Sequence, residues 1–200
     1  MGSKAVAALC AAIATALMAL GAATATARNL SLSDQNIRIT FTDLEFRAGE
    51  VRQDCHVTLE GSFHRATFAK SPEALVGYLT RALPGQCSLG LTILAETLPW
   101  HVRYQGFGGT LPEIASITAK IFGASFRVST CLLRGNIEFV AVRDPVTRVL
   151  TGVEVPLERN SELPLTGLLC PEPRLGNLRS NGQGTVTVLA SASRITVTLI

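Results

Sequence analysis

The chain has 200 residues, of which 47% are hydrophobic and 16% are charged, and its formal net charge at pH 7 is +3. Loss of residues 1–27 would remove Lys4 from the 18 basic residues and leave 17 basic against 15 acidic side chains. Proteins that bind nucleic acids through their phosphates carry a much larger basic excess, so no nucleic-acid partner is expected. The length suits one domain built around one core.

The N-terminal segment predicts export from the cell. Lys4 precedes an uncharged, alanine-rich run over 5–23, and the small residues at 25–27 fit a signal-peptidase site before Arg28. The run is nearly long enough to span a bilayer, but it is only weakly apolar. We therefore expect a signal peptide at 1–27 and one β-rich domain at 28–200, secreted or extracellular and associated with the cell envelope. No membrane span would remain after cleavage, and retention of the segment as an anchor is the alternative.

Apolar and polar residues alternate at period two along the mature chain, which indicates half-buried antiparallel strands. The first clear case is Ile37-Arg38-Ile39-Thr40-Phe41-Thr42. Glycine and proline separate such segments, where turns are favourable. The expected fold is a mainly β, single-domain antiparallel β-sandwich or barrel, stapled by disulfides, with at most one or two short helices. Further strands are expected at 98–107, 124–130, 137–142, 151–157, 185–188 and 194–200.

Residues 55–64, CHVTLEGSFH, have the composition of a metal site, with Cys55, Glu60 and two of the three histidines. In a strand, however, His56 and His64 would lie roughly 26 Å apart at about 3.3 Å per residue, too far for one ion. The β-branched and aromatic residues of the segment favour a strand with His56, Glu60 and His64 on its outer face. We therefore predict no metal site here and no cofactor.

The cysteines of the mature chain are Cys55, Cys87, Cys131 and Cys170, and none belongs to a C-x-x-C motif. In an exported protein, two disulfides are the expected state. Ser71 lies 16 residues after Cys55 and 16 before Cys87. A hairpin that turns at Ser71 would bring these two together, which favours Cys55 with Cys87 and Cys131 with Cys170.

The segments 71–83 and 110–123 are compatible with either a helix or a strand. Ser71-Pro72 and the Thr110–Glu113 spacing both resemble helix starts. A hairpin at Ser71 argues against the first helix, and arms of that length require a bend or bulge near Gly61 and Gly77.

The C-terminal segment 184–200 predicts a hairpin. Val186 and Val188 would lie on the first arm, and the turn would fall at 191–193. The second arm would bury Ile195, Val197 and Leu199, so the final strand is expected to be structural.

Residues 98–107, LPWHVRYQGF, contain the candidate ligand-binding residues Trp100, His101 and Arg103. In a strand, Trp100 faces one way, while His101 and Arg103 share a polar row that could bind an anion or a sugar. A solvated sheet face is the simpler explanation of that row. The chain has no G-x-S-x-G, H-E-x-x-H, P-loop or G-x-G-x-x-G motif, so no catalytic residues are assigned. A hydrolase that uses His101 or His64 is the alternative.

Residues 163–167, LPLTG, match the LPxTG pentapeptide that resembles a sortase substrate. A sorting signal also needs a hydrophobic tail with a basic end, but Arg194 interrupts the apolar stretch and the sequence finishes at Ile200. Cleavage there would remove Cys170. A proline-containing loop is the simpler interpretation, and a sortase-anchored surface protein is the second alternative.

The segments GSFH, LPWHVRY and GASF and the ending TVTVL…RITVTLI resemble a group of uncharacterised secreted bacterial proteins, over most of the mature chain. The resemblance implies secretion and β-structure at 110–130, and it implies no site residues. Together with the signal and the cysteines, it leads us to expect an exported, non-enzymatic binding or structural module, whose partner would be an envelope glycan or protein.

Overall fold

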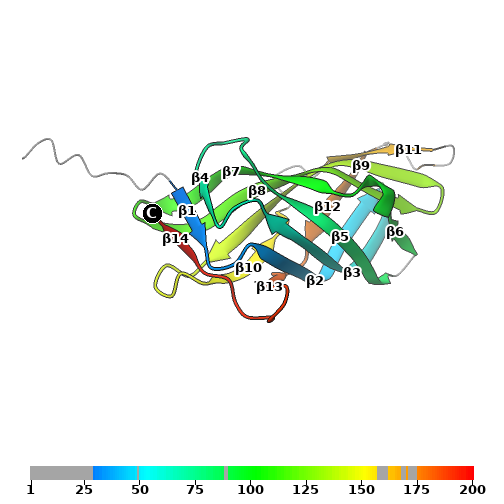
Figure 1. Cartoon of the computed structure of the whole chain (residues 1–200). Coiled ribbons are helices and arrows are strands. Elements are labelled where there is room, and N and C mark those ends of the chain that lie inside the picture. The colour runs from blue at the N-terminus through cyan, green and yellow to red at the C-terminus, as the bar shows by residue number, and fades with distance from the viewer. Residues whose placement is uncertain (1–28, 49, 88–89, 157–161, 168–169, 171–174) are drawn as a thin grey trace, which may run out of the picture.

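The computed structural model describes residues 29–48, 50–87, 90–156, 162–167, 170 and 175–200, and the predicted signal peptide and cleavage site lie outside them. The described residues form antiparallel strands and one short 3-10 helix, which confirms the predicted fold class (Figure 1). The segments left open between helix and strand are extended over most of their length, since 75–83 belong to β5 and 113–123 belong to β8. The elements are β1 (Asn29–Leu32), β2 (Asn36–Ala48), β3 (Val51–Phe63), β4 (Thr67–Ala69), β5 (Leu75–Cys87), β6 (Leu91–Ile93), η1 (Ala95–Thr97), β7 (Trp100–Thr110), β8 (Glu113–Val128), β9 (Cys131–Arg143), β10 (Leu150–Glu154), β11 (Glu162–Thr166), β12 (Leu175–Ser180), β13 (Thr185–Val188) and β14 (Val197–Leu199).

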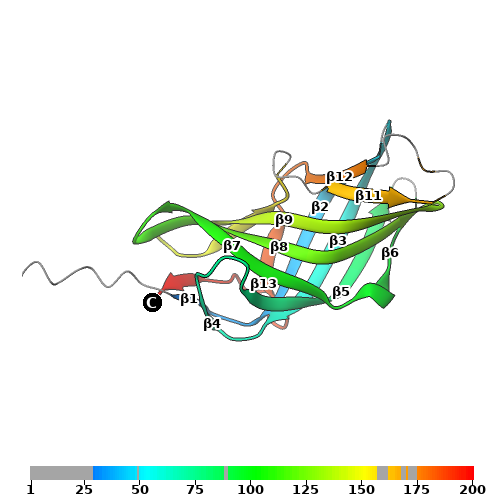
Figure 2. The same ribbon diagram turned by 90° about the horizontal axis from the view of Figure 1, so that it is seen from above.

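The large sheet closes on itself, so the structure is a barrel rather than a sandwich. Six long strands follow one another in the order β2-β3-β5-β7-β8-β9. Two pairs of short strands join β9 back to β2: β11 and β12 at one end, and β10 and β13 at the other. Figure 2 shows the long strands wrapping around a common axis. Closure protects strand edges that would otherwise be exposed.

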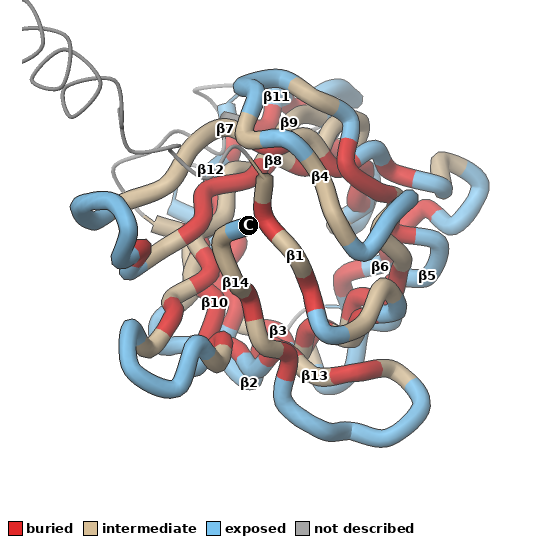
Figure 3. The backbone as a smooth tube through the Cα atoms, turned by 60° about the vertical axis from the view of Figure 1, so that its left-hand side comes forward, coloured by how far each residue is buried: buried red, intermediate tan, exposed pale blue. Residues whose placement is uncertain are grey.

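A second sheet of three strands, in the order β14-β1-β4, covers one end of the barrel. Figure 3 looks toward this end and shows β1 lying across the middle of the ring. Leu30 of β1 and Val197 of β14 are fully buried, because their side chains complete the core at this end. The first and last described strands therefore form the cap together.

The period-two pattern places every second side chain of the long strands inside the barrel. In β2, for example, Ile37, Ile39 and Phe41 are buried. The buried residues form one continuous hydrophobic core that runs from the cap to the opposite end. The part of the chain that the structure describes contains no helix that could span a bilayer.

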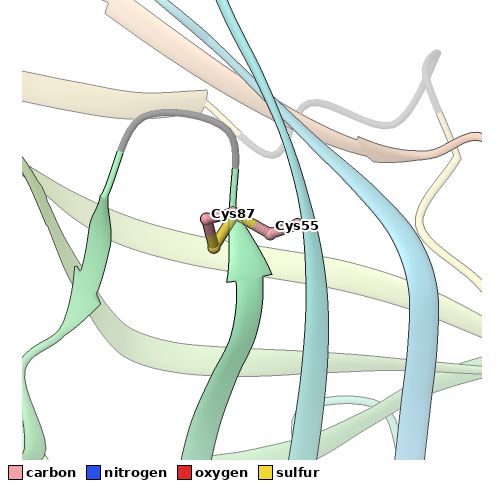
Figure 4. Close-up of a disulfide and its surroundings, with 2 residues drawn as sticks. All are labelled: Cys55 and Cys87. Atoms are coloured by element: carbon pink, nitrogen blue, oxygen red, sulfur yellow. A yellow bond between two sulfur atoms is a disulfide. The ribbon is translucent and has the colours of Figure 1, made fainter.

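Both predicted disulfides form, Cys55 with Cys87 and Cys131 with Cys170. Cys55 and Cys87 lie directly opposite each other on β3 and β5 (Figure 4). The expected irregularities are also present, since the strand register shifts next to Gly61 and next to Gly77. A Cβ on Gly61 would meet the carbonyl oxygen of Tyr78, so the close approach of β3 and β5 requires glycine there.

The predicted C-terminal hairpin is wrong in its pairing. Val188 N–H donates to Ser193 O at the expected turn, and one isolated bridge joins Thr187 to Arg194. Beyond this bridge the arms separate, because β13 pairs with β2 and β14 pairs with β1. Period-two alternation predicts that one face of a strand is buried, but it does not predict which strand pairs with it.

Candidate binding face

Strand β7 separates the three candidate ligand-binding residues onto two faces. Trp100 is 1% exposed and lies inside the barrel, whereas His101 is exposed and Arg103 is half-buried on the outer side. The indole Nε1–H of Trp100 donates to Thr97 Oγ1 over 2.9 Å, and its ring packs edge-on against Phe126. Trp100 is therefore a core residue and does not share a site with the other two. The ligand-binding roles of His101 and Arg103 stay predictions.

His101 has an aromatic residue beside it on each neighbouring strand of the outer surface. Tyr78 of β5 is the register partner of His101, and His101 is the register partner of Phe122 of β8. The ring of Tyr78 lies 4.9 Å from the His101 ring and 4.6 Å from the His64 ring, centroid to centroid. The alignment follows from strand pairing, which places residues of neighbouring strands side by side on one face.

Two cations lie next to this row. Arg103 of β7 is the register partner of Lys120 of β8. The Arg103 guanidinium carbon is 5.2 Å from the centre of the Phe122 ring, and the Lys120 ammonium is 5.8 Å from it. A ring that holds two cations by cation–π attraction orients them before any ligand arrives. We call Tyr78, His101, Arg103, Lys120 and Phe122 the aromatic–cationic face.

The charge of Arg103 is only weakly compensated. Its Nη1 donates to the backbone oxygen of Glu73 over 3.4 Å and lies 4.0 Å from the Glu73 carboxylate, and both side chains are about half exposed. An exposed pair at this distance contributes little. The Nε–H of Arg103 is buried and has no hydrogen-bond partner. The exposed part of the guanidinium is therefore the part that a ligand could contact.

A different outer cluster pairs its charges within the protein. The Glu45 carboxylate is fully buried beneath Arg47, Arg52 and Arg179, at 3.0, 2.9 and 2.8 Å. Burial raises the pKa of Glu45, but hydrogen bonds from Arg179 and Asn181 and the charges of Arg179 and Arg52 outweigh it, so the pKa lies below its ordinary value. This cluster joins β2, β3 and β12 and is structural.

Glu60 lies on the outer side as predicted, where it pairs with Arg38 at 2.8 Å and with Arg81 at 3.3 Å. It therefore links β2, β3 and β5. His56 and His64 are exposed. Within the described ranges, no three or more His, Cys, Asp or Glu side chains are grouped so that they could hold a metal ion.

The hydrolase interpretation needs a histidine beside a nucleophile or a carboxylate. His64 and His101 instead each contact the Tyr78 ring. In the part of the chain that the structure describes, neither imidazole is hydrogen-bonded to a serine, aspartate or glutamate side chain. The geometry adds nothing to this interpretation, which stays a prediction.

The LPLTG pentapeptide is part of the barrel wall rather than a loop. Glu162, Leu163 and Pro164 pair with β12, and Leu165 and Thr166 pair with β9. Leu163 and Leu165 are buried. A sortase would have to extract this strand from the sheet to reach the bond after Thr166.

Sequence reasoning missed Tyr78, Lys120 and Phe122 as parts of a candidate site. They lie on strands that are separated from His101 by 19 to 23 positions, and only the register of β5, β7 and β8 brings them together. The usable signal was the outward position of each residue within its own alternating strand.

No protein-family model, no curated protein and no solved structure matches the chain.

Proposed function

We propose that the protein is an exported, non-enzymatic binding module that holds an acidic glycan on its aromatic–cationic face. The observation that carries the proposal is the strand register that places Arg103 beside Lys120, with both cations against Phe122. Carboxylate or sulfate groups of a glycan would pair with the two cations. The rings of Tyr78 and His101 would offer apolar surface to the C–H groups of the sugar.

Several features favour a glycan over other anionic polymers. The near balance of basic and acidic residues after signal removal does not suit nucleic-acid binding. The neighbouring hollow is lined partly by polar residues, among them Ser116 and Thr118, which suits a ligand rich in hydroxyl groups. The two disulfides fit the oxidising conditions outside the cytoplasm.

Export is tested separately from binding. We expect protein from an exporting host to begin at or near Arg28 and to contain no free thiol. N-terminal sequencing and thiol titration under denaturant measure both properties. Retention of Met1, or four titratable thiols, would contradict export.

Binding is tested by calorimetric titration of the exported protein with a soluble polyuronate and with neutral dextran. We expect the polyuronate to bind, dextran to bind much more weakly, and the polyuronate affinity to fall as salt is added, because salt screens exposed charges. Arg103→Ala and Lys120→Ala should each weaken binding about tenfold, the loss expected for one charge-assisted hydrogen bond.

Arg127→Ala is the matched control. Arg127 is an exposed cation of β8, but it lies next to the end of that strand, whereas Lys120 lies at its middle. Arg127→Ala lowers the net charge by the same amount as Arg103→Ala or Lys120→Ala. It should leave the affinity for the polyuronate unchanged. The proposal would be overturned if Arg127→Ala lost as much affinity as the other two variants, or if the polyuronate did not bind. It would also be overturned if a single-stranded oligonucleotide or anionic vesicles bound more tightly than the polyuronate.

A further inference from the structure

Two hollows lie at opposite sides of the aromatic–cationic face. The first, of about 420 Å³, lies between β4 and the start of β5 and is lined by His64, Phe68 and Leu75 among others. The second, of about 250 Å³, lies over β7, β8 and β9 and includes Gly106 and Glu138 in its lining. Both are large enough to receive part of a ligand.

The strand register joins the two hollows in one line. Leu75 of the first hollow is the register partner of Arg103, Arg103 is the partner of Lys120, and Lys120 is the partner of Glu138 of the second hollow. The four residues therefore stand side by side on the outer surface. Because neighbouring strands are about 4.8 Å apart, the line is roughly 14 Å long. The two cations lie at its middle.

The second hollow exists because β7 has glycine where a side chain would otherwise stand. A Cβ at Gly106 would meet no atom within 4 Å, so the space above it is open. The lining of this hollow includes the polar residues Gln105, Ser116 and Glu138. Polar side chains around an open space suit the hydroxyl groups of a sugar ring.

We infer that the ligand is a linear chain of several acidic sugar units that lies across β5, β7, β8 and β9 and occupies both hollows, rather than a single sugar. This inference rests on the proposed function. Acidic groups near the middle of the chain would face Arg103 and Lys120. One sugar ring of the chain would enter the hollow at Gly106, where polar residues line the open space. The other end would lie against Leu75, which is 40% exposed.

The first test is a length series of polyuronate oligomers, from two to eight units, titrated into the exported protein. A ligand that fills both hollows gains contacts with each added unit until it reaches from Leu75 to Glu138. We expect the affinity to rise at least tenfold from the dimer to a longer oligomer and then to level off. Equal affinity for the dimer and the octamer would overturn the inference.

The second test fills one hollow. Gly106 lies within β7, and its φ is outside the left-handed region, so Gly106→Val suits the strand. The variant should melt like the unsubstituted protein, bind the dimer unchanged and bind the octamer about tenfold more weakly. Gly182→Val is the matched control, because Gly182 also has open space around it but lies in the turn between β12 and β13.

The outcomes separate the two proposals. Unchanged octamer binding by Gly106→Val would overturn the extended ligand while leaving the acidic glycan in place. Failure of every oligomer to bind the unsubstituted protein would overturn both proposals. A loss that Gly182→Val shares equally would also count against the hollow at Gly106.

Discussion

Asn29 and Ile200 exchange both of their backbone hydrogen bonds, each 3.1 Å long. The first described residue is thus paired with the last, and the pairing places β1 in the middle of the cap. Leu30 and Val197, on the two paired strands, are fully buried. The final strand is therefore expected to be essential to the fold.

Ile195, two residues before β14, tests how much the C-terminal segment contributes to stability. Its side chain is fully buried, and its carbonyl accepts a hydrogen bond from Leu150 N–H. Ile195→Ala should lower the free energy of unfolding by about 2–5 kcal/mol, measured by urea denaturation. Ile200→Ala, at a residue that is 56% exposed, is the control and should change it by less than about 0.5 kcal/mol.

Deletion of 194–200 extends the same test. It removes the whole of β14, and we expect no cooperative melting and no protease-resistant product. If the truncated protein melts like the intact one, the last strand is not part of the core, and processing at LPLTG regains weight.

Arg143 connects the barrel to the cap. It is 5% exposed, and its guanidinium donates to Val197 O over 2.8 Å and to Ile114 O over 2.7 Å. Arg143→Met keeps much of the side-chain volume and removes both hydrogen bonds. We expect a loss of about 1.5–3 kcal/mol for each charge-assisted bond in urea denaturation. Arg148→Met, at an exposed neighbour, should have little effect, and equal losses in the two variants would contradict the linking role.

Glu45 should make the fold sensitive to acid. Its pKa in the folded protein lies below the ordinary value of 4.5, so its ionised form stabilises the fold above that pH. The stabilisation is lost as the pH falls through the lowered pKa, because the carboxyl is then protonated in both states. At pH 7, Glu45→Gln should cost about 3 kcal/mol, the order expected when one partner of a buried ion cluster is removed.

The measurement is the urea midpoint of both proteins between pH 7 and pH 3. The gap between Glu45→Gln and the unsubstituted protein should narrow below pH 4.5. Glu96→Gln, which removes an exposed carboxylate, is the control. If the difference in urea midpoint between the two proteins stays constant from pH 7 to pH 3, the charge of Glu45 is not what stabilises the fold.

The LPLTG strand should resist a sortase while the protein is folded. Leu163 is fully buried and Leu165 is 4% exposed, and strands lie on both sides of β11. Incubation of the native protein with a sortase that accepts LPxTG should leave it intact on an electrophoresis gel. The reduced and urea-unfolded chain, returned briefly to active conditions, should be cut. Rapid cleavage of the native protein would revive the anchoring alternative.

Much of the fold could be predicted because its causes are local. Alternation over 37–42 predicts a half-buried strand, and Ile37, Ile39 and Phe41 are buried together. The equal spacing of Cys55 and Cys87 about Ser71 predicts their pairing, because antiparallel arms place such residues opposite each other. Both expectations use only the period of a strand and the geometry of a hairpin.

The C-terminal arms show the limit of such reasoning. Val186 and Val197 are both buried, as alternation predicts, but they are covered by different neighbours: β13 lies against β2, and β14 lies against β1. The pattern of one strand holds no information about its partner when several edges compete for it. Closure of the barrel could not be predicted for the same reason, because it depends on which short strands join β9 to β2.

The antiparallel β class and the outward position of His101 and Arg103 could be predicted from single segments, because each depends on the period of a strand. The Cys55–Cys87 pairing followed from equal spacing about Ser71, and Cys131 with Cys170 followed by elimination. The closure of the sheet, the meeting of Arg103 and Lys120 at Phe122 and the hollow at Gly106 could be recognised only in the folded chain. These features arise from the register between strands that are far apart in the chain. Register is fixed by packing of the whole core, which no single segment encodes.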